Sequence, residues 1–492
     1  MTLACDPWFS PEGAFQASWF QYPSNEHLLD RALDVDAVLI SHEHLDHVDP
    51  WYLARLAPDV PVVCPKYPSP VLKQKILLGG DRTIVQLDPW VQQVFGLVSV
   101  FFVSEASPMN HDSAMVIMGD GCSLVNMNDA RLTPVQLRRI AEVVGGQIDL
   151  LFLQAAGASW FPICYEYETT HMTRLSRQKR VAKLRYVERA IAVSEAQRAF
   201  PFAGPPCFLD PELSRFNNEM ENGIFPDQQQ AVGWLRDRGV DNVTSLLPGD
   251  GWDGRQSVEL RDETLAGFDF RNPSAYLAEY AKARRGQIAA VRDRHPYPSE
   301  PMDEVFYSFF EPVLEMSPYF RERIDMRTGF EVSGPGGGEW TVDFRPGHEG
   351  IERGIGDVGY LYRFESRWLP PLLDGSVPWE DFFLSLRFSA WRSPDVYNDH
   401  LLGLLKFAFP DALDAVEDYE TSDRGKETIQ LEVGGVCYEV ERYCPHAGQD
   451  LSETGELLES GVLRCLGHHY EFDVATGRCL NGSIRDLETR RL

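Results

Sequence analysis

The chain has 492 residues, with 46 Lys and Arg against 74 Asp and Glu, which gives a formal net charge of −28. Such an acidic surface repels a nucleic-acid backbone, so nucleic-acid binding is excluded as the main function, and an anionic substrate needs a local basic pocket. Hydrophobic residues make up 43% and aromatic residues 12%, enough for several buried cores. At about 150 residues per domain, the length predicts two to four domains.

Neither a secretory leader nor a membrane span is expected. The first 20 residues lack a cationic start followed by an uninterrupted apolar run, and no stretch elsewhere approaches the roughly 18 apolar residues of a membrane span. We therefore expect a cytoplasmic protein without a membrane partner. Nine cysteines are few and odd in number, which favours metal or free-thiol roles over a disulfide framework.

The first 210 residues have the alternation of short apolar runs and turns that is typical of an α/β sandwich. Short apolar runs, typical of buried strands, are separated by turns and loops at residues 37–40, 60–64, 97–103, 114–118 and 149–153. A charged, periodic stretch over 174–197 predicts one long helix, and residues 199–202 after it predict a short extended segment. A cluster of turn residues then predicts a domain boundary; it comprises Pro248, Gly249, Gly251 and Gly254.

The middle of the chain, from about 262 to 420, has helical stretches at each end and strand-like segments such as 340–344 and 359–365 between them. A glycine-rich segment at 334–338 lies between two strand-like runs, which favours a tight turn over a phosphate-binding loop. From about residue 426 the chain is rich in strands and turns. We therefore predict three domains: an α/β domain over 1–255, an α+β module over 256–425 and an all-β domain over 426–492.

Two short cysteine and histidine pairs mark the C-terminal domain. Cys444-Pro445-His446 and Cys465-Leu466-Gly467-His468 each offer one thiolate and one imidazole from a hairpin-like loop. This arrangement resembles a Rieske domain, in which two cysteines hold one iron and two histidines the other. A zinc site of two cysteines and two histidines is the alternative, but zinc pairs usually separate Cys from Cys and His from His by a few residues. We therefore predict a 2Fe-2S cluster bound by Cys444, His446, Cys465 and His468.

A second set of ligand-type residues follows the apolar run at 37–40. His42, His44, Asp46 and His47 form an H-x-H-x-D-H pattern in one loop at a strand end. The pattern resembles that of the metallo-β-lactamase superfamily, in which such a loop binds one or two metal ions. Asp6 occupies the place of the superfamily's opening strand end. The resemblance implies an αββα sandwich for the N-terminal domain.

The same resemblance implies further ligands on later loops. His111 and Asp129 stand in the expected order, and Asp46 and Asp129 are also the candidate catalytic carboxylates. Hydrolytic members place a final histidine after a late strand, where this chain has Ala203. His171 is a substitute candidate, with a histidine at a helix entry as the equally open alternative. One metal or an unsymmetrical pair is therefore expected.

The two motifs together predict redox chemistry. Zinc has no redox chemistry, so an electron-transfer cluster in the same chain indicates non-haem iron, one or two ions, in the N-terminal site. His and carboxylate ligands with open positions suit iron that uses O2, which makes a monooxygenase the expected enzyme. No G-x-G-x-x-G follows a strand here, so we expect electrons from an external donor, a ferredoxin or cytochrome with its reductase.

The combination of the two motifs resembles the family of CMP-N-acetylneuraminate and UDP-N-acetylmuramate hydroxylases. The similarity includes the segments at 161–166, 201–204 and 379–382. It implies hydroxylation of N-acetyl to N-glycolyl on a nucleotide-linked amino sugar, with the C-terminal position of the Rieske domain favouring the muramate branch. A homo-oligomer, in which the cluster of one subunit serves the site of another, stays open.

Two alternatives remain from the sequence. The same oxygenase scaffold could oxidise an amino-acid-derived or secondary metabolite at carbon or nitrogen, or the chain could be a metal-dependent hydrolase with a vestigial Rieske domain. Cationic residues along 174–185 are candidates for binding the substrate diphosphate, against a solvated helix face. Near the Rieske motif, Arg464, Arg478 and Arg485 are candidates for docking the electron donor, against ordinary solvated arginines.

Overall fold

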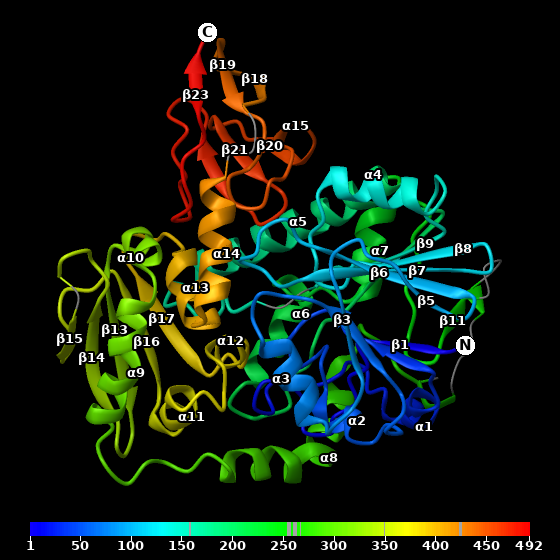
Figure 1. Ribbon diagram of the computed structural model, residues 1–492, viewed down its shortest axis with the longest axis horizontal. Helices are drawn as coiled ribbons and strands as arrows, with labels where there is room; N and C mark the ends of the chain where they lie inside the picture. Colours follow the sequence, from blue (N-terminus) through cyan, green and yellow to red (C-terminus); the bar gives the residue numbers. More distant parts are fainter. Residues whose placement is uncertain (157–158, 253–256, 259–262, 266, 349, 423–425) are drawn as a thin grey trace. The chain divides into compact units, whose positions relative to one another are not determined.

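The computed structural model describes the chain except residues 157–158, 253–256, 259–262, 266, 349 and 423–425 (Figure 1). It divides into two compact units, each formed from several segments. The first unit comprises Met1–Glu105, Asn110–Ala158 and Thr173–Ala290, and the second comprises Ala106–Met109, Ser159–Met172 and Val291–Leu492. Both predicted domain boundaries, and Gly254, fall on residues outside the described part, so the three-domain division stays a prediction.

The first unit contains two β-sheets. A four-stranded parallel sheet runs β1 (Leu3–Cys5), β2 (Ala37–Leu39), β3 (Val62–Pro65) and β4 (Ile84–Leu87). A six-stranded mixed sheet runs β10 (Arg198–Phe202), β9 (Leu150–Gln154), β8 (Cys122–Asn126), β7 (Ser113–Gly119), β6 (Val98–Ser104) and β5 (Gln93–Phe95). The five apolar runs predicted as strands therefore form β2, β3, β6, β7 and β9.

The two sheets pack face to face, and helices cover their outer faces. Leu39 and Val63 from the first sheet form one buried cluster with Phe102 and Met115 from the second. Residues that alternate with these along the strands, such as Val38, point outward into a second cluster with the helices that follow. The helices of this second cluster are α1 (Leu29–Leu33), α2 (Pro50–Leu53) and α3 (Val71–Leu78). Later in the chain come α4 (Pro134–Val143), α5 (Thr169–Ser194), of which the first unit contains the part from Thr173, α6 (Glu219–Asn222) and α7 (Gln228–Arg236). The layered architecture confirms the predicted αββα sandwich.

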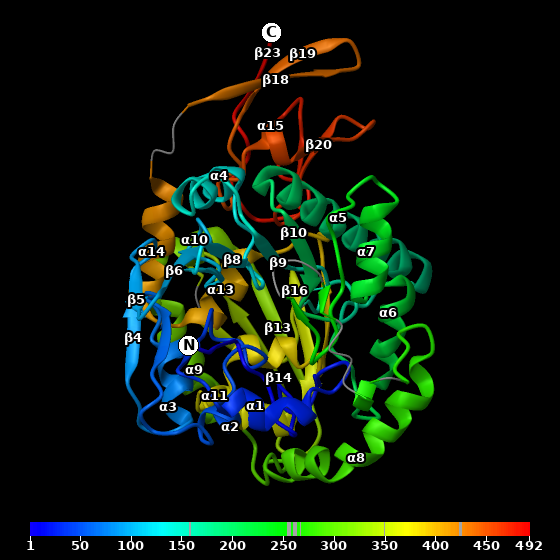
Figure 2. The same cartoon turned by 90° about the vertical axis from the view of Figure 1, so that its right-hand side faces the viewer.

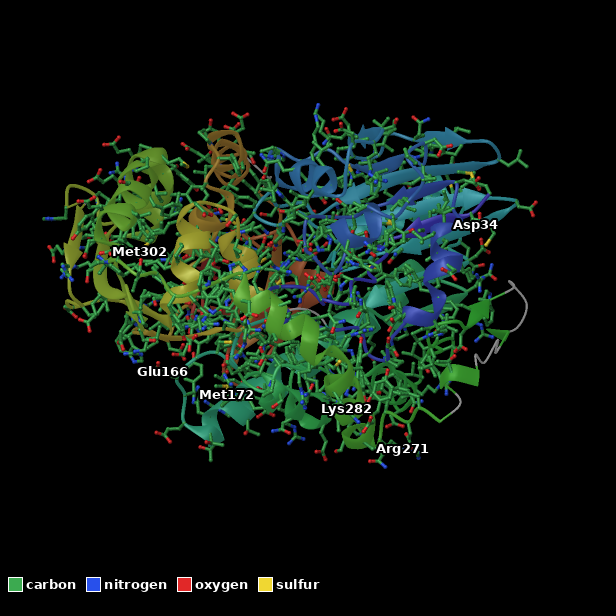
Figure 3. All side chains as sticks on the ribbon, turned by 90° about the horizontal axis from the view of Figure 1, so that it is seen from below. Asp34, Glu166, Met172, Arg271, Lys282 and Met302 are labelled. Carbon is green, nitrogen blue, oxygen red and sulfur yellow. The ribbon has the colours of Figure 1, made fainter. Side chains whose placement is uncertain are left out.

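The first unit extends well past the predicted boundary cluster, through the short hairpin β11 (Gly251–Trp252) and β12 (Ser257–Val258) into α8 (Pro273–Asp293). The backbone amide of Ser24 donates to the hydroxyl of Tyr276 at 2.8 Å, and Arg284 forms an ion pair with Glu26 at 2.5 Å. These contacts join α8 to the N-terminal segment. Other side chains on this stretch, such as Lys282, are exposed at the outer surface of the unit (Figure 3).

The second unit contains a five-stranded sheet in the order β15-β14-β13-β16-β17 (Figure 1), of which Figure 2 labels β13, β14 and β16. Its strands are β13 (Arg327–Ser333), β14 (Gly338–Asp343), β15 (Gly350–Arg353), β16 (Tyr360–Glu365) and β17 (Phe388–Arg392). The predicted glycine-rich turn joins β13 to β14, because Gly334 and Gly336 have φ of +100° and +68°, which other residues rarely adopt. Phe306 stacks on Trp340 with ring centroids 4.5 Å apart, so aromatic packing holds helices on this sheet.

The helices of the second unit are α9 (Asp303–Met316), α10 (Pro318–Ile324), α11 (Leu369–Leu373), α12 (Trp379–Leu384), α13 (Asp399–Phe407) and α14 (Pro410–Thr421). Of these, α13 is buried along most of its length. Among the described residues, no helix combines the length and the apolar character that crossing a membrane requires.

The C-terminal part of this unit is built from two small sheets, as predicted from its strand and turn pattern. One contains β18 (Thr428–Val433), β19 (Val436–Glu441) and β23 (Thr489–Arg491), and the other contains β20 (Gly455–Leu457), β21 (Val462–Cys465) and β22 (Glu471–Asp473). A short helix, α15 (Leu451–Thr454), precedes β20. Val440, Leu463 and Phe472 share a buried cluster that joins the two sheets.

Candidate metal centres

The H-x-H-x-D-H loop follows β2 and is held by Asp6 at the end of β1. Asp6 accepts hydrogen bonds from the amide and hydroxyl of Ser41 at 2.8 and 2.6 Å. Its carboxylate also contacts Nδ1 of His47 at 2.9 Å, while the Ser41 hydroxyl lies 2.8 Å from Nδ1 of His42. Both rings are thereby oriented through Nδ1, which turns their Nε2 atoms toward a shared space.

Three ligand-type atoms converge in the first unit. His42, His44 and Asp129 each place one donor atom within 4.8 Å of the others, and Nε2 of His42 lies 2.9 Å from Nδ1 of His44. Asp129 reaches this focus from the loop after β8. Two imidazole nitrogens and a carboxylate oxygen, all buried or nearly so, suit a divalent transition metal, so the residues fit the implied metal ion.

Asp46 and His47 lie beside the converging atoms of His42, His44 and Asp129. Nε2 of His47 lies 3.4 Å from Oδ1 of Asp129 and 3.7 Å from Oδ2 of Asp46. Burial disfavours the charged form of His47, but Asp46, Asp129 and Asp6 outweigh it and raise the pKa of this imidazole well above its ordinary value. A metal that binds here must displace that proton, because a histidine coordinates in its neutral form.

The pKa values of the two carboxyl groups are shifted in opposite directions. Burial raises the pKa of Asp46, and this effect exceeds the opposing attraction of His47. Burial also acts on Asp129, but His47 and His44 together hold the pKa of that carboxyl down at about 2. Asp129 is therefore the carboxylate that stays ionised and ready to coordinate a cation.

His111 lies on the loop between β6 and β7 and contacts a residue that the sequence did not single out. Its Nδ1 is 3.0 Å from Oε1 of Glu43, and its ring stacks on Tyr67 with centroids 4.6 Å apart. The next residue, Asp112, places Oδ1 3.6 Å from Nε2 of His42. The structure therefore brings this loop to the site through Asp112, while His111 lies outside the converging group found among the described residues. Its role as a ligand stays a prediction.

Glu43 and Asp112 were not predicted as site residues, because the histidines next to them already matched the expected ligand pattern. Glu43 stands between the two leading histidines of the motif, and Asp112 directly follows His111. His171 belongs to the second compact unit, where its ring lies 5.0 Å from that of Tyr167. Its predicted part in the metal site stays a prediction.

One lysine of the basic run at 174–185 is buried. For this run a solvated helix face and diphosphate binding were both considered, but the ammonium of Lys183 on α5 is buried and donates to Oε1 of Gln154 at 3.0 Å and to the carbonyl of Ala156. Burial lowers its pKa well below the ordinary value, an effect that Asp129 partly opposes. The backbone amide of Gln154 in turn donates to the carbonyl of Asn128 at 3.2 Å, so Lys183 supports the turn that carries Asp129.

Other members of that basic stretch differ in exposure. Arg180 donates to Oε1 of Gln230 at 3.0 Å and to the carbonyl of Glu221 at 3.1 Å, so its guanidinium joins α5 to its neighbours. Arg174 and Arg177 are exposed. Diphosphate binding, the alternative to a solvated helix face over 174–185, is therefore not supported for Lys183 and Arg180, because their cations make hydrogen bonds inside the first unit.

The two Rieske-type loops lie after β19 and after β21. Cys444 and Cys465 are 2% and 1% exposed, and the hydrogen bond between their thiols, together with burial, raises the pKa of Cys444 well above its ordinary value. The rings of His446 and His468 pack with centroids 4.6 Å apart. Thiol beside thiol and imidazole beside imidazole is the grouping that a 2Fe-2S cluster requires when two cysteines hold one iron and two histidines hold the other. These residues fit the cluster.

Backbone and charge contacts hold both loops. The amide of Cys444 donates to the carbonyl of Gln449, and that of Cys465 donates to the carbonyl of Tyr470, both at 2.8 Å. Arg442 binds Asp450 at 2.7 Å, and Asp450 caps α15 through the amide of Ser452. Each ligand-bearing loop is thus closed on itself.

Two of the three arginines considered for docking the electron donor form ion pairs within the C-terminal domain. Arg464 binds Glu471 at 2.6 Å and Glu456 at 3.4 Å, and Arg485 binds Glu441 at 2.5 Å. Their charge is therefore neutralised locally. Arg478 is exposed and is the remaining member of the predicted docking set.

A carboxylate outside both motifs lies beside the Rieske loops. Asp399, the first residue of α13, accepts a hydrogen bond from the hydroxyl of Tyr470. Burial raises the pKa of the Asp399 carboxyl to about 6, against the lowering effect of that hydrogen bond. No spacing pattern in the middle of the chain pointed to this carboxylate.

Comparisons with known proteins agree with both motifs. Residues 2–194 match the beta-lactamase superfamily domain, and residues 413–487 match the Rieske [2Fe-2S] domain. A Rieske 2Fe-2S iron-sulfur protein of Mycolicibacterium smegmatis is 31% identical over 515 residues, which cover 100% of this chain and 96% of the relative. A Rieske 2Fe-2S iron-sulfur protein of Mycobacterium tuberculosis has the same identity and coverage.

A more distant relative is the cytidine monophosphate-N-acetylneuraminic acid hydroxylase of Mus musculus. It is 20% identical over 424 residues, which cover 80% of this chain and 69% of the relative. The predicted pairing of a metallo-β-lactamase-like domain with a C-terminal 2Fe-2S Rieske domain is confirmed. The chain belongs to the family of Rieske 2Fe-2S iron-sulfur proteins that its two mycobacterial relatives represent.

Proposed function

We propose that the protein is a Rieske-dependent, O2-using hydroxylase whose N-terminal site binds non-haem iron. The observation that carries the proposal is the presence in one chain of a Rieske set of two cysteines and two histidines and a separate buried set of histidines and carboxylates. An electron-transfer cluster has no use beside a hydrolytic zinc site, because hydrolysis transfers no electrons. The hydroxylase relative from mouse supports the same reaction class.

In this proposal His42, His44 and Asp129 hold the iron, with Asp46, His47 and His111 as further candidates. When bound, iron supplies O2 binding and redox chemistry, and the Rieske cluster supplies single electrons. Asp6 and Ser41 keep the rings of His42 and His47 in orientation through their hydrogen bonds. Such supporting contacts raise ligand basicity and preserve the geometry of the site.

We further propose that the substrate is a nucleotide-linked N-acetyl amino sugar of the UDP-N-acetylmuramate class, hydroxylated on its acetyl methyl. The overall reaction converts R–CH3, O2, two electrons and two protons into R–CH2OH and water, and an external donor provides the electrons. A methyl C–H bond has no electrophilic carbon for a metal-bound hydroxide to attack, so hydrolytic chemistry cannot serve. Exposed Arg174 and Arg177 on α5 are the candidates for meeting the diphosphate.

The test is a reaction of the reduced protein with UDP-N-acetylmuramate, an electron donor and 18O-labelled O2, followed by mass spectrometry. We expect a product that gains one labelled oxygen atom. CMP-N-acetylneuraminate in a parallel reaction separates the muramate from the sialate branch. His468→Ala, which removes one predicted cluster ligand, serves as the control and should give no product while the N-terminal metal remains.

Other outcomes identify the competing functions. Electron consumption without a labelled product from either sugar nucleotide would redirect the search to amino-acid-derived or secondary metabolites. Zinc in the N-terminal site, together with turnover of an ester or lactone in the absence of O2, would contradict the oxygenase and establish a hydrolase. Elemental analysis of the purified protein is therefore the first measurement.

A further inference from the structure

The N-terminus of α13 meets the histidine side of the Rieske site. Oδ1 of Asp399 lies 4.0 Å from Nε2 of His446 and accepts the hydroxyl hydrogen of Tyr470. The ring of Tyr470 also packs against the ring of His446, with centroids 4.8 Å apart. One carboxylate, one phenol and one ligand imidazole therefore form a closed group next to the cluster position.

The peptide segment around Asp399 is fixed to the C-terminal domain. The amide of Tyr397 donates to the carbonyl of Asn481 at 3.0 Å, and the amide of Asp399 donates to the hydroxyl of Ser483 at 3.2 Å. Asn398 caps α13 by accepting from the amide of Leu401 at 2.9 Å. Hydrogen bonds of the backbone amides at Tyr397, Asp399 and Leu401 thus hold the segment that carries the carboxylate.

The carboxylate of Asp399 has fewer side-chain hydrogen-bond partners than that of its acidic neighbour, and the charge of His400 also acts on it. Glu420 on α14 has two partners, Nε2 of His400 at 2.9 Å and the hydroxyl of Tyr319 at 2.6 Å. Oδ2 of Asp399 is buried without a hydrogen-bond partner. Over the described residues, His446 is the one cationic-type side chain that forms an ion-pair contact with Asp399. A buried carboxylate of this kind acts strongly on a nearby centre, because little solvent screens it.

We propose that Asp399 is a positioning residue of the Rieske centre, whose carboxylate faces Nε2–H of His446 and lowers the reduction potential of the cluster. With Nε2 directed to Asp399, Nδ1 is the nitrogen with which His446 would hold the iron. A negative charge at this place stabilises the oxidised cluster, which carries one more positive charge than the reduced cluster. Charge and hydrogen bonding around the ligands are among the main determinants of Rieske potentials.

Through Asp399 the middle of the chain has a chemical role at the Rieske centre. Asp399 lies outside residues 413–487, which match the Rieske domain, so the domain itself does not contain this carboxylate. A helix of the preceding module supplies it to the cluster. The potential of the centre then depends on α13 staying docked, and an isolated Rieske domain would have a different potential from the whole protein.

The test is a redox titration of the full-length protein carrying Asp399→Asn, with the cluster followed by visible absorption and by electron paramagnetic resonance. The amide keeps the shape of the side chain and removes its charge. We expect a higher midpoint potential, with about a tenfold change in the ratio of reduced to oxidised cluster at a fixed potential, or about 59 mV for a one-electron couple. Asp411→Asn, an exposed carboxyl in the first turn of α14, is the matched control and should leave the potential unchanged.

A second variant tests the sign. Tyr470→Phe removes the hydroxyl that draws charge from Oδ1 of Asp399, so at alkaline pH the potential should fall, opposite to the effect of Asp399→Asn. An intact cluster with an unchanged potential in Asp399→Asn would overturn the proposal. If that variant fails to assemble a cluster, a rise in potential in Tyr470→Phe would contradict it instead. Neither measurement involves a substrate, so the outcome is independent of the proposed hydroxylation.

Discussion

The two candidate metal centres are constructed in opposite ways. The candidate Rieske ligands come from two short loops, each with one cysteine and one histidine, and backbone hydrogen bonds close both loops. The candidate N-terminal ligands come from loops after different strands, and a network of carboxylates and one buried lysine holds them. A centre built from self-contained loops should lose its metal only when a ligand changes. A centre held by a network should also respond to residues far from the metal.

The largest expected effect is the loss of the cluster in Cys444→Ser. A serine hydroxyl does not replace the thiolate that iron-sulfur clusters require, so the visible absorption of the 2Fe-2S centre should disappear. The N-terminal metal should remain, since each site is assembled within its own compact unit. Iron and sulfide analysis together with absorption spectroscopy would measure both.

The matched control for the cluster is His469→Asn. His469 adjoins the ligand His468 but has φ of +68°, a conformation that asparagine tolerates better than most residues. This variant should retain the cluster. Loss of the cluster in His469→Asn, or its retention in Cys444→Ser, would contradict the assignment of the four ligands.

The next effect distinguishes a network-held site from a self-contained one. Asp6→Ala removes the partner of both Ser41 and His47 without touching His42, His44 or Asp129. We expect about a 10- to 100-fold loss of affinity for the N-terminal metal, the usual result of removing a group that orients a ligand. Competition with a chelator would measure it, and the exposed Asp30→Ala should behave like the unaltered protein. Equal affinities in the two variants would show that the loop needs no support.

A smaller effect is expected from Lys183→Met, which keeps the aliphatic stem and removes the buried ammonium. The side-chain oxygen of Gln154 and the carbonyl of Ala156 would lose their donor, at a cost of about 1–3 kcal/mol in the free energy of unfolding. Denaturant unfolding would measure this cost. Lys282→Met, at an exposed position labelled in Figure 3, should change stability by less than about 0.5 kcal/mol. Equal effects of the two lysines would argue against a structural role for Lys183.

The smallest effect concerns the substrate. If exposed Arg177 meets the diphosphate, Arg177→Gln should raise KM about threefold with little change in kcat, because an exposed ion pair contributes only roughly 0.2–1 kcal/mol. Steady-state kinetics at low and high salt would test it, since screening should reduce the difference. A change in kcat with an unchanged KM would place Arg177 in another role.

Much of the first unit could be anticipated from local patterns. The strands β2, β3, β6, β7 and β9 coincide with short apolar runs between turns, because a buried strand has few alternatives to a continuous run of apolar residues. The predicted helix over 174–197 is α5, which begins earlier, at Thr169. Its early start was not evident, because Thr169, Thr170 and Thr173 are weak helix formers and the stabilising contacts of the helix are remote in sequence.

The four candidate Rieske ligands and the H-x-H-x-D-H loop were predicted from the sequence alone, because ligand spacing within a short loop is set by the local backbone. Tertiary structure alone placed Glu43 against His111, Lys183 behind the turn of Asp129, and Asp399 beside His446. Each of these residues is an ordinary acid or lysine in its own segment. It acquires a role only when folding buries it next to a group that is distant in the chain. There little solvent screens its charge, so the charge acts strongly on that group.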